Sequence, residues 1–68
     1  MRSWEQKLQQ VIELTKIARE LAATSRIWAE TEGEPKEILV SIDIVDASLK
    51  TASVNAKKLI DLDSNNAE

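Results

Sequence analysis

The feature that most constrains this chain is a stripe of apolar and small residues that mirrors itself about the single glycine, Gly33. On either side of Gly33 the stripe alternates steps of four and three residues, the spacing of one face of an α-helix. Folding the chain back at Gly33 pairs the two stripes, and near the turn small residues meet bulky ones, so that the two surfaces can interdigitate. The expected pairs are Leu8 with Leu59, Val11 with Ala56, Thr15 with Ala52, Ala18 with Leu49, Ala22 with Val45, Ser25 with Ile42 and Ala29 with Ile38. The sequence therefore predicts an all-α fold, an antiparallel two-helix hairpin.

Local signals place the ends of the two helices. Ser3 is expected as the N-cap of the first helix, with Gln6 completing a capping box. Gly33 suits the left-handed position after a helix, and Pro35 suits the first turn of the next one, with Glu34 as its cap. We expect a single helical-hairpin domain over 1–68, with helix 1 at about 3–32, a turn at 33–34, helix 2 at about 35–62 and a frayed tail at 63–68.

One segment has an alternative interpretation. Residues 38–45 are rich in β-branched side chains and also fit the alternation of a strand, which would need a partner strand from another chain. The helical stripe, however, runs unbroken from Ile38 to Leu59, and a strand accounts for only its first third. We favour the helix and keep the strand as the alternative.

The chain carries more apolar surface than a two-helix hairpin can bury. A chain of 68 residues with no cysteine and no histidine has neither a disulfide nor an ordinary zinc site to stabilise it, which leaves self-association. A second apolar seam on helix 1 lies about a quarter-turn from the first, as a four-helix bundle requires. We therefore expect two hairpins to form a homodimer, a four-helix bundle. The self-association residues would be Leu14, Ile17, Leu21 and Trp28.

Helix 2 has a second stripe that lies nearly opposite its first. The residues that could bind a partner are Val40, Ile44, Ala47 and Val54, together with Trp4 on helix 1. The stripe either joins the core of a dimer or larger oligomer, or forms a groove for an amphipathic helix of another protein. Trp4 either closes the open end of the bundle near Leu62 or serves as an exposed binding anchor, a role in which tryptophan is enriched.

The side-chain inventory argues against an enzyme. Without histidine and cysteine the chain cannot assemble a Ser-His-Asp or Cys-His system, and with one glycine it has no phosphate-binding loop. We expect no catalytic residue, no cofactor and no metal, because the aspartate pairs Asp43/Asp46 and Asp61/Asp63 offer too few ligands for a divalent ion. No apolar run approaches the roughly 20 residues of a membrane span, so we expect a cytoplasmic protein that has no membrane as a partner.

Charge separates the remaining functions. The net charge is -3, and all of the excess lies after Gly33. We expect surface pairs Lys16–Glu20 and Arg26–Glu30 on helix 1. The first hypothesis is a small, non-enzymatic, self-associating adaptor or regulator that binds another protein. The alternative is an RNA-binding hairpin in which a dimer aligns Lys16, Arg19 and Arg26, although interleaved glutamates make nucleic acid the less favoured partner.

Overall fold

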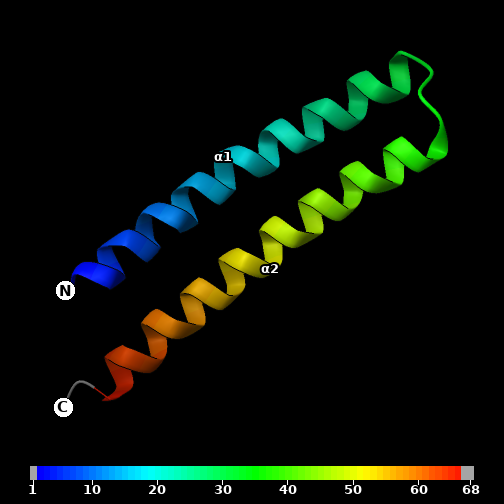
Figure 1. Ribbon diagram of the computed structural model, residues 1–68. Helices are drawn as coiled ribbons and strands as arrows, with labels where there is room; N and C mark the ends of the chain where they lie inside the picture. The colour runs from blue at the N-terminus through cyan, green and yellow to red at the C-terminus, as the bar shows by residue number, and fades with distance from the viewer. Residues whose placement is uncertain (1, 67–68) are drawn as a thin grey trace.

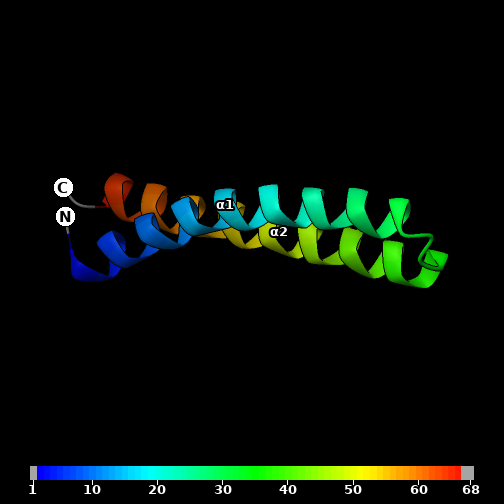
Figure 2. The same cartoon turned by 90° about the horizontal axis from the view of Figure 1, so that it is seen from above.

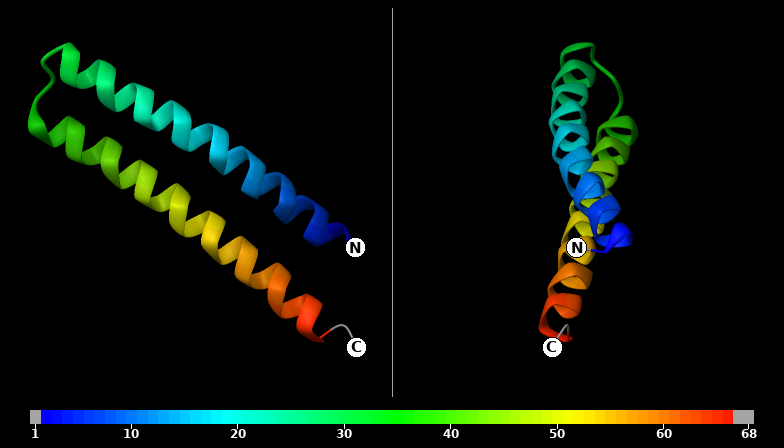
Figure 3. Two further views of the ribbon diagram at one scale, coloured as in Figure 1. Left: turned by 180° about the vertical axis from the view of Figure 1, so that it is seen from behind. Right: turned by 90° about the vertical axis from the view of Figure 1, so that its left-hand side faces the viewer.

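The protein is a hairpin of two long antiparallel helices in a computed structural model that describes residues 2–66. Helix α1 spans Ser3–Thr31 and helix α2 spans Lys36–Asn66. The helices lie side by side along their length, and the start of α1 and the end of α2 are at the end opposite the turn (Figure 1). Seen from above, they cross at a shallow angle (Figure 2), and the views in Figure 3 agree. The predicted hairpin is thus confirmed, and no strand occurs within residues 2–66, so the strand interpretation of 38–45 was wrong.

The turn has the form that the single glycine predicted. Gly33 has a φ of 76°, in the left-handed region, and follows Glu32 at the C-cap. The Gly33 N–H donates to the Glu30 carbonyl at 3.1 Å, and the Glu34 N–H donates to the Ala29 carbonyl at 3.0 Å. These two hydrogen bonds form a Schellman motif, which satisfies the last carbonyls of α1 and redirects the chain.

Helix α1 begins at residue 3 as expected, but its N-cap is Arg2 and not Ser3, and α2 begins one residue later than expected. Ser3 is already helical, and the backbone N–H of Arg2 donates to Glu5 Oε1 at 2.9 Å, so Glu5 takes the role expected of Gln6. Glu5 is correspondingly buried. Helix α2 begins at Lys36, where the Pro35 carbonyl accepts from the Ile38 N–H at 3.0 Å. At its other end α2 continues four residues past the expected end at 62, and residues 67–68 of the expected tail lie outside the described residues.

The contact between the helices follows a seven-residue repeat. Between residues 2 and 63, every side chain that is not exposed, apart from Ala18, belongs to two inner columns on each helix. The inner columns of α1 are 5, 12, 19, 26 and 8, 15, 22, 29, and those of α2 are 39, 46, 53, 60 and 42, 49, 56, 63. A strict heptad repeat of this kind keeps one seam facing the partner helix, as in a coiled coil.

The core inside this seam is thin. Its most buried apolar residues are Ile12, Ala22, Ala29 and Ala56. Thr15 is also buried and satisfies its hydroxyl by donating to the Ile12 carbonyl at 2.7 Å. Three of the four apolar residues are alanines, so the helices approach closely but bury little apolar area per turn.

The expected facing stripes were only half right. Leu8, Thr15, Ala22 and Ala29 on α1, and Ile42, Leu49 and Ala56 on α2, lie in the inner columns as expected. The other expected positions on both helices are exposed, apart from the half-buried Ala18. The exposed ones are Val11, Ser25, Ile38, Val45, Ala52 and Leu59. Each helix is turned by one column relative to the expectation. The column that enters the seam on α1 carries Arg19 and Arg26, and the one on α2 carries Asp46, the partner of Arg19.

Candidate interaction surface

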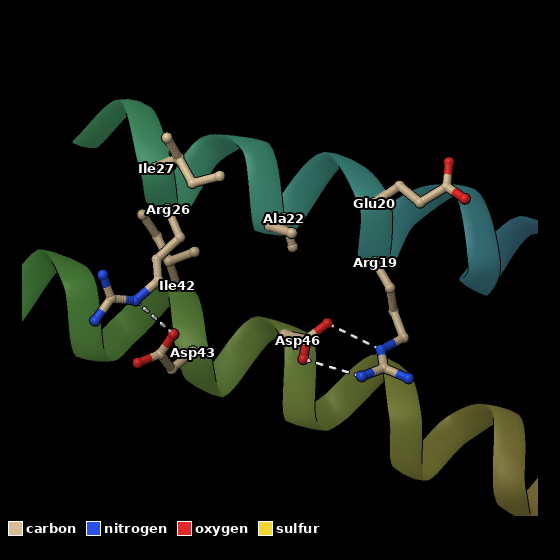
Figure 4. A pocket seen from close by; sticks show the side chains of 9 residues that line it. Arg19, Glu20, Ala22, Arg26, Ile27, Ile42, Asp43 and Asp46 are labelled. Carbon is tan, nitrogen blue, oxygen red and sulfur yellow. Dashed lines mark hydrogen bonds and ion pairs between the residues drawn. The ribbon is translucent and has the colours of Figure 1, made fainter. Parts of the chain in front are cut away.

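The two helices are joined by ion pairs along one edge of the seam. Arg19 forms a two-point pair with Asp46, with Nε to Oδ1 at 2.9 Å and Nη2 to Oδ2 at 3.2 Å. Arg26 Nε donates to Asp43 Oδ1 at 3.0 Å, and Arg2 Nη1 lies 3.1 Å from Asp63 Oδ1. Figure 4 shows Arg19 and Arg26 extending from α1 to Asp46 and Asp43 of α2. All three arginines of the chain are on the α1 side, and three of its four aspartates answer them from α2.

The Arg19–Asp46 pair shifts the ionisation of both groups. The hydrogen bonds from Arg19 are the main cause that lowers the pKa of Asp46. Partial burial opposes them, and the positive charges of Arg19 and Lys50 each lower the pKa by a smaller amount. The same pair raises the pKa of Arg19. The carboxylate is therefore held ionised and can act as a fixed acceptor, and it is not poised to exchange protons near neutral pH.

These pairs engage the residues of the expected basic strip. Arg19 and Arg26 both face aspartates, and Arg26 also donates to Glu30 Oε2 at 2.8 Å, the pair expected from the sequence. Lys16 contacts Glu13 at 3.5 Å instead of the expected Glu20. Each of these cations has a carboxylate beside it, which reduces the positive potential that a phosphate backbone would meet. Similarly, Asp43, Asp46 and Asp63 bind arginine, and no group of three acidic side chains within residues 2–66 could hold a metal ion.

The opposite side of the seam is apolar. Each helix has a column whose residue numbers are one lower than those of its first inner column, beginning at residue 4 on α1 and at residue 38 on α2. In an antiparallel pair these two columns flank the same side of the interface. On α1 this column holds Trp4, Val11, Ala18 and Ser25, and on α2 it holds Ile38, Val45, Ala52 and Leu59. Leu14, Leu21 and Trp28 form the next column outward on α1, and Leu62 lies in the corresponding column of α2. We call these twelve residues the apolar face.

The apolar face is open to solvent and hollowed near the turn. The large members are all more than a third exposed, and Leu14, Leu21 and Trp28 reach 63%, 66% and 65%. A groove at the turn end is lined by residues of both helices and of the turn: its apolar lining includes Leu21, Trp28 and Ile38, and its acidic lining includes Glu32 and Glu34. Each helix has two columns on this side of the seam. Lys7 is the one charged residue of the helices α1 and α2 that lies in these columns.

The structure divides the sequence-predicted site residues into two surfaces. Leu14, Leu21 and Trp28 share the apolar face, whereas Ile17 lies on the outer side of α1, away from α2. Trp4 also lies on the apolar face, at the open end, and not with the other residues proposed to bind a partner. Those four form an exposed stripe on the outer side of α2, toward the ion-pair edge: Val40, Ala47 and Val54 in one column and Ile44 beside it.

Sequence reasoning missed part of this surface. Val11, Ile38, Val45 and Leu59 were assigned to the interior of the hairpin, and the structure exposes them beside Leu14, Leu21 and Trp28. The signal that could have found them is the seven-residue spacing of Arg19 and Arg26 on one half, with the aspartates that pair with them, Asp46 and Asp43, on the other. Arginines at heptad spacing on one helix, opposite aspartates on the other, indicate the seam between two antiparallel helices and leave the uncharged columns outside it.

No helix within residues 2–66 is both long enough and apolar enough to cross a membrane.

Comparison with known proteins identifies no relative of this chain. The chain matches no protein-family model, and no curated protein and no solved structure is significantly similar to it.

Proposed function

We propose that this chain is a small, non-enzymatic, self-associating helical protein that works as an adaptor or regulator by binding another protein. In this proposal two hairpins pair through their apolar faces into a four-helix bundle in the cytoplasm. The outer stripe of α2 stays accessible in that dimer, because it lies on the other side of the seam, and it offers an apolar strip to a second protein.

The observation that carries the proposal is that α1 packs a charged column against α2 and leaves a more apolar column exposed. The hairpin encloses the α1 column that contains Glu5, Arg19 and Arg26, while the uncharged α1 column that begins with Trp4 and Val11 remains outside. A monomer gains nothing from exposing the more apolar of two neighbouring columns. A second copy that covers the apolar face would bury it, and the ion pairs would then stay at the solvated edge.

The surface area supports the same conclusion. The hairpin exposes 5259 Å² of accessible surface. A compact protein of 7.6 kDa would expose about 4,300 Å² according to the scaling of surface with mass. The difference, on the order of 1,000 Å², is similar to the roughly 800 Å² that each partner buries in an interface of standard size.

A matched pair of substitutions tests the proposal. Leu21 on the apolar face is 66% exposed and Ile27 on the ion-pair side is 62% exposed, so a glutamate at either position meets the same solvent in the monomer. We expect Leu21→Glu to convert the dimer to a monomer, because a buried unpaired carboxylate costs several kcal/mol, and Ile27→Glu to leave the dimer intact. Sedimentation over a range of concentrations measures both, with helicity followed by circular dichroism.

Two outcomes would contradict the proposal. Wild-type protein that remains a folded monomer at high micromolar concentration would show that the apolar face does not pair. Equal loss of the dimer in both variants would show that a different surface joins the two copies.

A further inference from the structure

The net charge of the chain is concentrated at one end of the hairpin. Residues 30–37 contain four glutamates, Glu30, Glu32, Glu34 and Glu37, against Lys36, so that this turn end carries the whole net charge of -3. The remaining acidic and basic side chains balance. A dimer that placed two turns side by side would bring two such clusters together, whereas an antiparallel arrangement separates them by the length of the hairpin.

The open end of the apolar face complements the turn end. The groove near the turn is lined by apolar residues that include Trp28 and Ile38 and by the carboxylates Glu32 and Glu34. At the other end lie Trp4, which is 41% exposed, and Lys7, the charged residue of the flanking columns. An exposed indole next to a cation is the chemistry that an apolar groove rimmed by carboxylates would accept.

The positions along the helix also match. The midpoint of α1 is residue 17, so a two-fold axis through this level relates Trp4 to the level of residue 30, within one turn of Trp28. Near this midpoint the columns next to the seam carry the small residues Ala18 and Ala52, while Leu14 and Leu21 lie about one turn to either side in the outer column of α1. Small side chains at the axis let the two hairpins approach, and the bulky ends then meet across the interface.

From these observations we infer that the occupant of the apolar face is a second copy of this chain in antiparallel orientation, with its Trp4 in the turn-end groove and its Lys7 beside Glu32 and Glu34. This inference rests on the proposed self-association and specifies its geometry. Each groove is completed by the other copy, so the dimer contains two identical tryptophan contacts.

Distance measurement between labels distinguishes the two orientations. Because the chain has no cysteine, Thr31→Cys gives one spin label per chain at the turn. In the antiparallel dimer the two labels lie about 45 Å apart, since 29 residues of α1 rise roughly 1.5 Å each. Lys16→Cys, near the midpoint and on the solvated side, serves as a control whose distance is the same in either orientation.

The outcomes separate this inference from the proposed function. A dimer with turn labels closer than about 25 Å would overturn the antiparallel orientation and leave self-association standing. A monomer with no distance between labels in either variant would overturn both proposals, including the case in which another protein is the natural occupant.

A charge reversal provides a second test. Lys7 and Glu34 are at opposite ends of one hairpin, so they can meet only across two copies. We expect Lys7→Glu to weaken dimerisation about fivefold and Glu34→Lys in the same chain to restore it. Failure of the double variant to recover the affinity would exclude the contact.

Discussion

Arg19 and Asp46 show how single residues position the two helices. The two-point pair joins side chains that remain about two-fifths exposed, 42% for Arg19 and 39% for Asp46, so its main effect is to fix geometry. Sliding α2 by one heptad would bring Leu39 or Ser53 opposite Arg19 and break the pair. The apolar residues repeat along the helix and tolerate such a shift, whereas the ion pairs define the register.

The ionisation of Asp46 gives a pH-dependent prediction. Its pKa is lower in the folded protein than in the unfolded chain, so its stabilising effect is fully present above the ordinary aspartate pKa of about 4 and is lost as the pH falls through the lowered value. We expect Asp46→Asn to lower the free energy of unfolding at pH 7 and to match wild type in strong acid. Urea unfolding at a series of pH values measures the difference.

Asp61→Asn is the control, because it removes the same charge from α2 outside the interhelical pairs. A loss that is the same for Asp46→Asn at pH 7 and in strong acid would refute the role of the ion pair. It would instead indicate a packing effect.

At the scale of the helices, the α1 end depends on the backbone conformation of Gly33. A Cβ added there would meet nothing within 4 Å, so the φ of 76° is the one obstacle to a larger residue. We expect Gly33→Ala to lower the free energy of unfolding by about 1 kcal/mol, since a left-handed conformation is unfavourable for L-residues. Chemical denaturation at fixed protein concentration gives the value.

Gly33→Asn distinguishes this cause, because asparagine tolerates the left-handed region better than alanine. It should lose less stability than Gly33→Ala. If both variants were as stable as wild type, the Schellman turn would contribute nothing to the fold.

How far the sequence predicts these elements depends on the kind of signal. The turn at Gly33 was predictable, because only one conformation of that residue ends a helix in this way. The rotation of each helix was not, since Leu8, Thr15, Ala22 and Ala29 face the partner helix in both the expected and the observed packing. The second column was chosen by ion pairs between residues far apart in the chain, and such long-range pairing is invisible to a periodicity of apolar residues.

Only part of the apolar face could be predicted from the sequence. Leu14, Leu21 and Trp28 lay outside any stripe that the hairpin could cover, so they were identified as surplus. Val11 and Val45 were hidden among residues assigned to the interior, and their exposure depends on the same rotation.

At the scale of the whole molecule, the proposed dimer still presents apolar surface. If the apolar faces pair, the outer stripe of α2 remains open, with Ile44 61% exposed. We expect the isolated dimer to bind a hydrophobic dye and Ile44→Glu to reduce that binding severalfold without dissociating the dimer. Fluorescence titration of dimer purified by size exclusion measures the effect.

Gln10→Glu is the matched control, because it places the same charge on the outer side of α1 without removing an apolar side chain. A wild-type dimer that binds no dye would argue against the outer stripe as a docking strip for another protein.

Because the start of α1 and the end of α2 lie at the same end of the hairpin, the molecule responds to mechanical load in a particular way. A force applied between residues 2 and 66 of one hairpin pulls α1 and α2 apart at the open end, where Arg2 and Asp63 are paired. The load then acts on one level of the seam at a time and peels the helices toward Gly33, instead of shearing the whole contact at once. The hairpin is therefore soft along this direction, and a second copy that bridges the open end of one chain and the turn of the other would stiffen it.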